Sequence, residues 1–260
     1  MWTLYDKLIG QISDEYIANE VIAGLSWTAI QSKSLGLAMS MPRSLQPSPL
    51  SGNCQGQPIQ KLANSIKSWD FFEASLGLSA INSATNTLES VLSMESEGYR
   101  QLGSKSALSL IADKVTGKRV AVIGHFPDLD KLASTCQLTI LERRLQIGDT
   151  PDPAAEYLLP EQDIVIMTSS TLINKTAPRL LELSKDAVTI MLGPSTPLSP
   201  VLFEMGVDMI SGLIVEDEEN VLRCVKEGGG MRTFRNAVRY VNLAKADSLI
   251  GKWEMKSERV

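Results

Sequence analysis

The chain has 260 residues, of which 43% are hydrophobic and 21% charged, the composition of a globular protein with one large domain or two smaller ones. A net charge of −5 argues against nucleic-acid binding, which needs a concentrated basic face, and no apolar run approaches the roughly 18 residues of a transmembrane helix. The N-terminus lacks the basic start and apolar core of a signal peptide, and the three widely spaced cysteines suit reduced thiols, so we expect a cytoplasmic protein.

The first part of the chain is predicted to mix helices and strands. Leu4, Leu8 and Ile12 repeat every four positions, as in an amphipathic helix, and the segments that follow are rich in residues typical of strands. A long loop rich in proline, serine and glycine comes next. The predicted elements are a helix at 1–13, strands at 16–30 and 35–41 with a turn at 32–34, the loop at 42–58, and helices at 58–68, 70–93 and 104–116.

Asn82 interrupts a run of small side chains in the predicted helix at 70–93. Small residues let a helix approach a neighbouring element or a ligand closely, whereas asparagine neither favours a helix nor packs well. Asn82 is therefore either a packing residue bonded to nearby backbone or part of a binding site.

From residue 117 onward the pattern of strand, loop and helix repeats. Runs such as 164–167 are apolar on both faces, as strands buried between two helix layers must be. Because crossovers between parallel strands are right-handed, a doubly wound parallel sheet is the natural arrangement. The predicted strands are 119–123, 137–141, 163–167, 188–192 and 208–210 or 213–215, and the predicted helices are 128–135, 153–158, 174–184, 198–205, 218–228 and 231–248.

The last predicted helix would carry Arg232, Arg235 and Arg239 on one face. Such a stripe is usually solvated or forms a contact between subunits. We expect a homodimer, because two-fold symmetric dimers are the commonest assemblies.

Three of the predicted strands are followed at once by loops of small polar residues, at 124–127, 168–171 and 193–197. Loops at the carboxyl ends of parallel strands converge on one crevice, and that crevice is where ligands bind in open α/β sheets. The sequence therefore predicts a ligand site at this edge of the sheet.

The first of these loops departs from the dinucleotide fingerprint. After Gly124, the second and third glycines of G-x-G-x-x-G are missing, so the usual pyrophosphate cradle is not expected. Glu142 nevertheless ends the next strand, where nucleotide-binding folds place the carboxylate that accepts hydrogen bonds from a ribose. The alternative is a surface glutamate paired with Arg143 or Arg144.

His125 is the only histidine in the chain, and it follows a strand directly. It is a candidate general acid or base, or a metal ligand, because its pKa ordinarily lies near neutrality; the alternative is a structural, hydrogen-bonded imidazole. The chain has no C-x-x-C or H-x-x-x-H pattern. A metal site would have to be assembled from His125, Glu142 and either Cys54 or Asp128.

The other two loops are rich in hydrogen-bonding groups. Hydroxyl and amide groups before a helix bind anions, although a single one suffices to cap the helix. In the third loop, prolines stiffen the backbone and glycine permits an unusual angle, so that the two residues between them present hydroxyls with little freedom. The candidate ligand-binding residues are Thr168, Ser169, Thr171 and Asn174 of the second loop and Gly193, Pro194, Ser195, Thr196 and Pro197 of the third.

Together these motifs resemble a bacterial and archaeal family of uncharacterised proteins labelled "putative heavy-metal chelation". The resemblance covers nearly the whole chain and rests on residues 77–82, 124–127, 142, 163–174, 192–198 and 206–208. It implies a domain like the N-terminal domain of enolase over 1–100 and a Rossmann-like ligand-binding domain over 101–260. It also implies a site in the cleft between them, to which Asn82 would belong. The cofactor stays open, and a divalent transition metal is the candidate.

Three functions are compatible with these patterns. The first is binding of a small anionic or heteroaromatic ligand in the interdomain cleft, in the handling of a heavy metal or a metal-chelating metabolite. The second is an enzyme that transforms a nucleotide-like or pterin-like metabolite, with His125 as acid or base. The third is a non-catalytic dimeric assembly protein.

Overall fold

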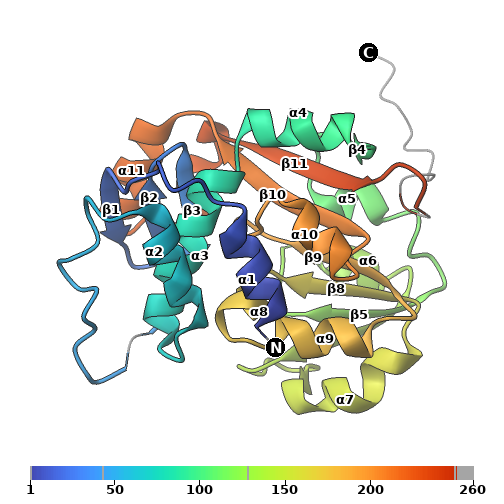
Figure 1. Cartoon of the computed structure of the whole chain (residues 1–260). Coiled ribbons are helices and arrows are strands. Elements are labelled where there is room, and N and C mark those ends of the chain that lie inside the picture. Colours follow the sequence, from blue (N-terminus) through green and yellow to red (C-terminus); the bar gives the residue numbers. More distant parts are fainter. Residues whose placement is uncertain (1, 43, 128, 249, 251–260) are drawn as a thin grey trace.

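A mostly parallel sheet of eight strands lies at the centre of the computed structural model, which describes residues 2–42, 44–127, 129–248 and 250 (Figure 1). Its strands are β4 (Tyr99–Gln101), β5 (Arg119–Ile123), β6 (Gln137–Glu142), β7 (Thr150–Pro151), β8 (Ile164–Thr168), β9 (Val188–Leu192), β10 (Met209–Val215) and β11 (Val238–Lys245). They are arranged in the order β4-β11-β10-β9-β8-β5-β6-β7. The β10–β11 and β11–β4 pairs are antiparallel, and the other pairs are parallel. The predicted α/β class is confirmed.

A second, antiparallel sheet stands beside the first and consists of β1 (Glu20–Ala23), β2 (Trp27–Gln31) and β3 (Leu35–Met39). The prediction of a single strand over 16–30 is wrong. The chain turns at Gly24, whose amide donates to the carbonyl of Trp27 (3.0 Å). A hairpin therefore takes its place. The turn predicted at 32–34 joins β2 to β3 as expected.

Helices cover both faces of the large sheet, as its apolar strands require. Val120 and Val122 point toward a cluster that includes the helices after β4 and β5, while Ala121 packs with helices on the opposite face. The helices are α1 (Thr3–Gly10), α2 (Ile59–Ala63), α3 (Phe71–Thr85), α4 (Leu88–Ser96), α5 (Ala107–Ile111), α6 (Leu129–Ala133), α7 (Ala155–Leu158), α8 (Ser170–Ile173), α9 (Ala177–Leu183), α10 (Pro200–Glu204), α11 (Glu218–Lys226) and α12 (Met231–Phe234). Within the described ranges, none of them is long and apolar enough to cross a membrane.

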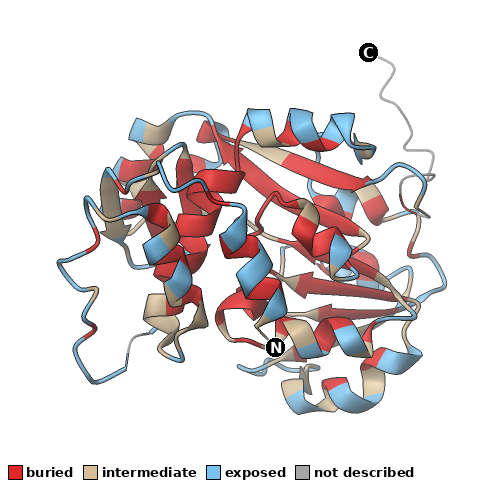
Figure 2. Cartoon of the chain, viewed as in Figure 1, coloured by how far each residue is buried: buried red, intermediate tan, exposed pale blue. Residues whose placement is uncertain are grey.

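Helix α3 is buried over most of its length (Figure 2). Its small residues allow the backbone of β3 to approach it: a methyl group at Gly36 would lie 2.2 Å from the carbonyl oxygen of Ser79 and from the amide nitrogen of Ser83. The run of small side chains around Asn82 is thus explained by close packing of a helix on a strand.

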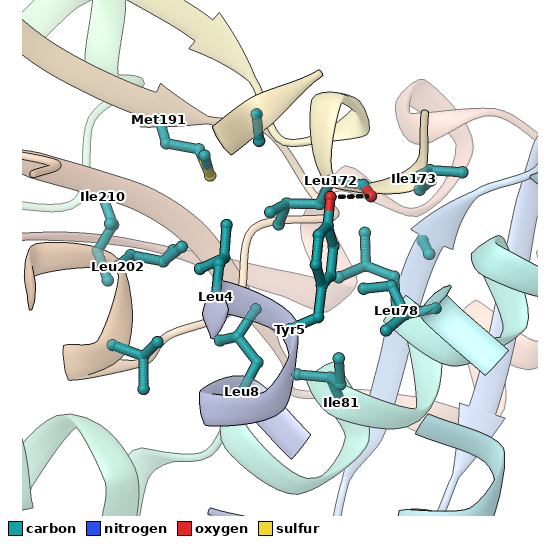
Figure 3. Close-up of a cluster of buried hydrophobic side chains, with 14 of the residues drawn as sticks. Leu4, Tyr5, Leu8, Leu78, Ile81, Leu172, Ile173, Met191, Leu202 and Ile210 are labelled. Carbon is teal, nitrogen blue, oxygen red and sulfur yellow. Dashed lines mark hydrogen bonds between the residues drawn. The ribbon is translucent and has the colours of Figure 1, made fainter. Parts of the chain in front are cut away.

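One hydrophobic core joins the N-terminal and C-terminal parts of the chain. Figure 3 shows Tyr5 of α1 among side chains of α3, α8, α10 and the large sheet, with its hydroxyl donating to the carbonyl of Leu172 (3.1 Å). The predicted domain boundary at residue 100 falls inside β4, which pairs with β11 at the edge of the large sheet.

The long helix predicted over 231–248 is wrong. The segment forms α12, one 3-10 turn (Arg235–Ala237) and then β11, which pairs with β10 along its whole length. Val238, Val241 and Leu243 are buried in this strand, so pairing with β10 outweighs the helical spacing of the arginines. Arg232, Arg235 and Arg239 therefore lie on three different elements and form no helical stripe.

The helix predicted over 70–93 divides into α3 and α4, because Thr87 caps the second helix by accepting from the amide of Ser90 (3.0 Å). The helix predicted over 174–184 begins only at Ala177, after Lys175 adopts a left-handed backbone (φ 67°). The strand expected at 208–210 or 213–215 is one continuous strand, β10. The helix predicted over 104–116 is shorter than expected, spanning Ala107–Ile111.

Replacing Gly36 with alanine is expected to lower the free energy of unfolding by about 3 kcal/mol, because the added methyl would collide with backbone atoms that cannot rotate away. Urea denaturation followed by circular dichroism measures this change. Gly10→Ala is the matched control, because nothing lies within 4 Å of the added methyl. Wild-type stability in Gly36→Ala would contradict this account of the packing.

Candidate functional site

A cavity of about 960 Å³ opens at the carboxyl ends of β5, β6 and β8. Its other wall comes from the N-terminal part of the chain, namely the β1–β2 turn, the end of β3 and the start of α3. The cavity thus lies where open α/β sheets bind ligands, with a second wall supplied by the small sheet and its helix.

The structure brings about half of the predicted site residues together around this cavity. Those that line it are Gly124, His125, Glu142, Thr168, Thr171 and Asn174. Those that do not line it are Asn82, Ser169, Gly193, Pro194, Ser195, Thr196 and Pro197. The lining residues that sequence reasoning missed are mainly apolar and come from the N-terminal part, including Met39, Met41, Phe71 and Phe72.

Asn82 and the loop at 193–197 meet at the junction between the small sheet and the large one. The Asn82 amide donates to the carbonyl oxygens of Leu37 (2.7 Å) and Ser195 (3.0 Å), and the Ser195 hydroxyl accepts from the amide of Met39 (2.8 Å). These groups are buried, and their partners are protein backbone. The contacts tie β3 and α3 to the loop after β9.

Asn86, the residue that directly follows the last turn of α3, strengthens this junction. Its amide donates to the carbonyls of Thr196 (3.0 Å) and Leu213 (3.2 Å), and its side-chain oxygen accepts from the amide of Leu198 (2.8 Å). Sequence reasoning missed Asn86. The available signal was a second asparagine four residues from the first, on the same face of a helix.

Glu142 is held in place by the backbone that follows it. One carboxylate oxygen, Oε1, accepts from the amides of Arg143 (2.6 Å) and Arg144 (3.0 Å). The pairing with these arginines is therefore through their backbone, and the Arg143 guanidinium instead binds Asp152 (2.9 Å). In the described part of the chain Oε2 has no hydrogen-bond partner, so it is free to accept from a ligand.

Arg144 also lines the cavity, and its side chain forms no ion pair with any described residue. The acidic groups nearby are already engaged, Glu142 by backbone amides and Asp152 by Arg143. Arg144 is thus a cation at the cavity that no described carboxylate pairs with, and it can bind an anionic group of a ligand.

His125 donates or accepts through Nε2 at 2.8 Å from the carboxylate of Asp149, a residue that sequence reasoning missed. Asp149 also accepts from the amide of Gln146 (2.7 Å). The Gln146 amide and the imidazole together hold the pKa of Asp149 below its ordinary value. No spacing rule could have paired the two residues, because the loop between β6 and β7 brings them together.

The polar side chains that follow β8 mainly form hydrogen bonds with other groups of the same loop. Thr171 donates to the carbonyl of Thr168 (2.7 Å), and Asn174 accepts from the amide and hydroxyl of Thr176 (3.1 and 2.6 Å). Helix α8 has only four residues, too short to supply the dipole of a helix N-terminus. Gly124 lies against Thr168 with φ 94°, which brings the first and second loops together.

Lys175 follows Asn174 and is buried, with its ammonium 5.7 Å from the centre of the Phe71 ring and 2.6 Å from the carbonyl oxygen of Ile173. Burial lowers the pKa of Lys175 from 10.5 to about 8. Phe71 lines the cavity and Lys175 does not, so Lys175 contacts a residue of the cavity wall without lining the cavity itself.

The donor set does not fit a heavy-metal ion bound by side chains alone. Among the described residues, no three of histidine, cysteine, aspartate and glutamate lie close enough together to hold a metal. His125 and Glu142 are engaged by Asp149 and by backbone amides, and no cysteine lines the cavity, although soft heavy metals prefer thiolates. The candidate Asp128 lies outside the described residues.

Two family models match different parts of the chain, and both carry the same description. Residues 106–244 match the family model DUF364 and residues 5–85 match DUF4213, both described as "Putative heavy-metal chelation". An uncharacterised protein of Methanocaldococcus jannaschii is 28% identical over 217 residues, which are 79% of each chain.

Two crystal structures are similar to this fold. A DUF364-family protein of unknown function from Desulfitobacterium hafniense superposes with a TM-score of 0.86 at 36% identity, covering 94% of this chain and 99% of that one. Another from Pyrococcus horikoshii gives a TM-score of 0.78 at 20% identity, over 93% of this chain and 98% of that one. The second likeness concerns the fold alone.

Asn82→Ala is expected to lower the free energy of unfolding by about 2 kcal/mol, because two buried hydrogen bonds across the junction are lost. Thermal and urea unfolding measure the effect. Asn53→Ala removes an amide on an exposed loop and serves as the control, with an expected change within about 0.5 kcal/mol. Unchanged stability of Asn82→Ala would contradict a structural role.

Lys175 predicts a distinctive pH dependence. Between pH 8 and 10.5 the unfolded chain keeps a proton that the folded protein has lost, so the contribution of Lys175 to stability rises with pH, by about 3 kcal/mol over the whole window. The measurement is the difference in unfolding free energy between wild type and Lys175→Met across this window. Taking the difference cancels the opposite effect of Tyr5, whose pKa burial raises. A constant difference would refute the prediction.

Proposed function

The chain belongs to the DUF364 family, and we propose that its cavity binds a small organic ligand that joins a flat, apolar portion to an anionic group. The observation that carries this proposal is the contrast between the two walls of the cavity. Aromatic and thioether side chains line one wall, while the other carries a prepositioned carboxylate and Arg144, whose side chain pairs with no carboxylate among the described residues.

The apolar wall suits a planar ring. Phe71 and Phe72 begin α3, and Met39 and Met41 lie at the end of β3 and just beyond it. Aromatic faces stack on flat rings, and methionine adapts its shape to what it contacts. A heteroaromatic ligand would bury its ring here.

The polar wall suits an anion and a hydrogen-bond donor on the same ligand. Arg144 would bind a carboxylate or phosphate, and Oε2 of Glu142 would accept from a ligand N–H or O–H group. Because backbone amides already orient the Glu142 carboxylate, little side-chain entropy is lost on binding. This is also the position at which nucleotide-binding folds receive a ribose.

The family description is best accommodated by a ligand that itself chelates the metal. The protein's own donors near the cavity are few and mostly engaged. A metabolite with several oxygen or nitrogen donors would complete a coordination shell without a protein thiolate. We therefore propose handling of a metal-chelating metabolite, with any contact between metal and protein secondary.

Thermal unfolding tests the proposal with a panel of pterins, nucleoside monophosphates, tetrapyrrole precursors and divalent metal ions, each alone and in pairs. A ligand of the folded state raises the melting temperature by mass action. We expect a shift with an organic anion that is lost in Glu142→Gln and in Arg144→Gln.

Two control variants remove the same charges, one negative and one positive, at the opposite edge of the sheet. Glu161 precedes β8 and Lys185 precedes β9, both exposed, so Glu161→Gln and Lys185→Gln should keep the wild-type shift. A shift produced by metal ions alone and retained in Glu142→Gln would overturn the proposal.

A further inference from the structure

We infer that His125 and Asp149 form a proton-transfer pair in this cavity, in which Asp149 orients the imidazole and Nδ1 of His125 acts as a base on the bound ligand. The inference rests on the proposed function, because it concerns the same cavity. It adds a reaction to what would otherwise be a binding site.

The geometry of the pair supports distinct roles for its two members. The side chain of Asp149 is only 2% exposed, whereas that of His125 is 30% exposed and lines the cavity. Asp149 is fixed by the Gln146 amide (2.7 Å) in addition to the imidazole (2.8 Å). The carboxylate is thus the anchored member and the imidazole the accessible one.

The carboxylate determines which imidazole nitrogen carries the proton. An ionised aspartate only accepts hydrogen bonds, so the neutral imidazole must donate to it from Nε2–H. The lone pair of a neutral imidazole is then on Nδ1. Among the described residues, Nδ1 has no hydrogen-bond partner.

The surroundings suit proton abstraction from an anionic or acidic ligand. The charged groups that line the cavity with His125 are Glu142, Arg143, Arg144 and Asp152, of which only the Arg144 side chain lacks a partner among the described residues. Arg144 is therefore available to stabilise negative charge that develops on the ligand.

The step is a simple proton transfer. Nδ1 of His125 takes a proton from an O–H, N–H or activated C–H group of the ligand, and the electron pair of that bond stays on the ligand as an anion. The imidazole becomes an imidazolium that keeps its Nε2–H bond to Asp149. Asp149 does not touch the ligand, so it is a positioning residue.

Nuclear magnetic resonance of protein labelled with ¹⁵N-histidine tests the pairing, and the single histidine makes the assignment unambiguous. Long-range ¹H–¹⁵N correlations should place the proton on Nε2 in the neutral wild-type imidazole. Asp149→Asn should lose this preference, because an amide can donate to Nε2. Asp186→Asn, an exposed residue at the opposite edge of the sheet, should keep it. A proton on Nδ1 in the wild type would overturn the inference.

A flat heteroaromatic probe, 5-nitrobenzisoxazole, tests the base itself. Removal of its ring C–H proton breaks the N–O bond and yields a nitrile and a coloured phenolate, so the reaction needs only a base. We expect release faster by about 100-fold in the wild type than in His125→Gln, an intermediate rate in Asp149→Asn and the wild-type rate in Asp186→Asn.

The two proposals fail in different ways. Equal rates of phenolate release in wild type and His125→Gln, with both proteins folded by circular dichroism, would overturn the proton-transfer role. Ligand-dependent thermal shifts that vanish in Glu142→Gln would then still support the binding function. If phenolate release depends on His125 but no ligand of the panel raises the melting temperature, the proposed ligand class is wrong and the role of His125 as a base still holds.

Discussion

The cavity depends on how α3 is fixed to the loop after β9. Asn82 near the end of this buried helix and Asn86, its C-cap, donate to the backbone carbonyls of residues 195 and 196, while Ser195 accepts from the backbone of β3. The shared apolar core holds the two parts of the chain together, but hydrophobic burial has no direction. The hydrogen bonds of the two asparagine side chains are directional, and so they fix the orientation of α3. This orientation determines where Met39 and Phe71 lie relative to the carboxyl ends of the strands.

Much of the fold follows from the sequence because a run that is apolar on both faces has few interpretations. The strands at 119–123 and 188–192 were predicted at the bounds that the structure has. The segment at 231–248 was not, because its arginines have helical spacing while Val241 and Leu243 alternate as in a strand. Only pairing with β10, a contact between distant residues, decides between the two.

The candidate site was predictable in position but not in detail. The three strand exits could be aligned at one edge of a parallel sheet, and Glu142 ends the expected strand. The apolar wall could not be foreseen, because it depends on how α3 and β3 dock. Hydroxyl-rich loops are equally suited to ligands and to backbone carbonyls, so the sequence alone could not separate the loop at 168–171 from the one at 193–197.

The segment between β6 and β7 concentrates the chemistry of the cavity in a few residues. Its backbone orients Glu142, it carries Arg144, and it holds Asp149 against His125. None of these groups takes part in the junction between α3 and the loop after β9. An exchange of this short segment between relatives would therefore replace the Arg144 cation and the groups that orient Glu142 and His125, while leaving both of those residues and the junction in place.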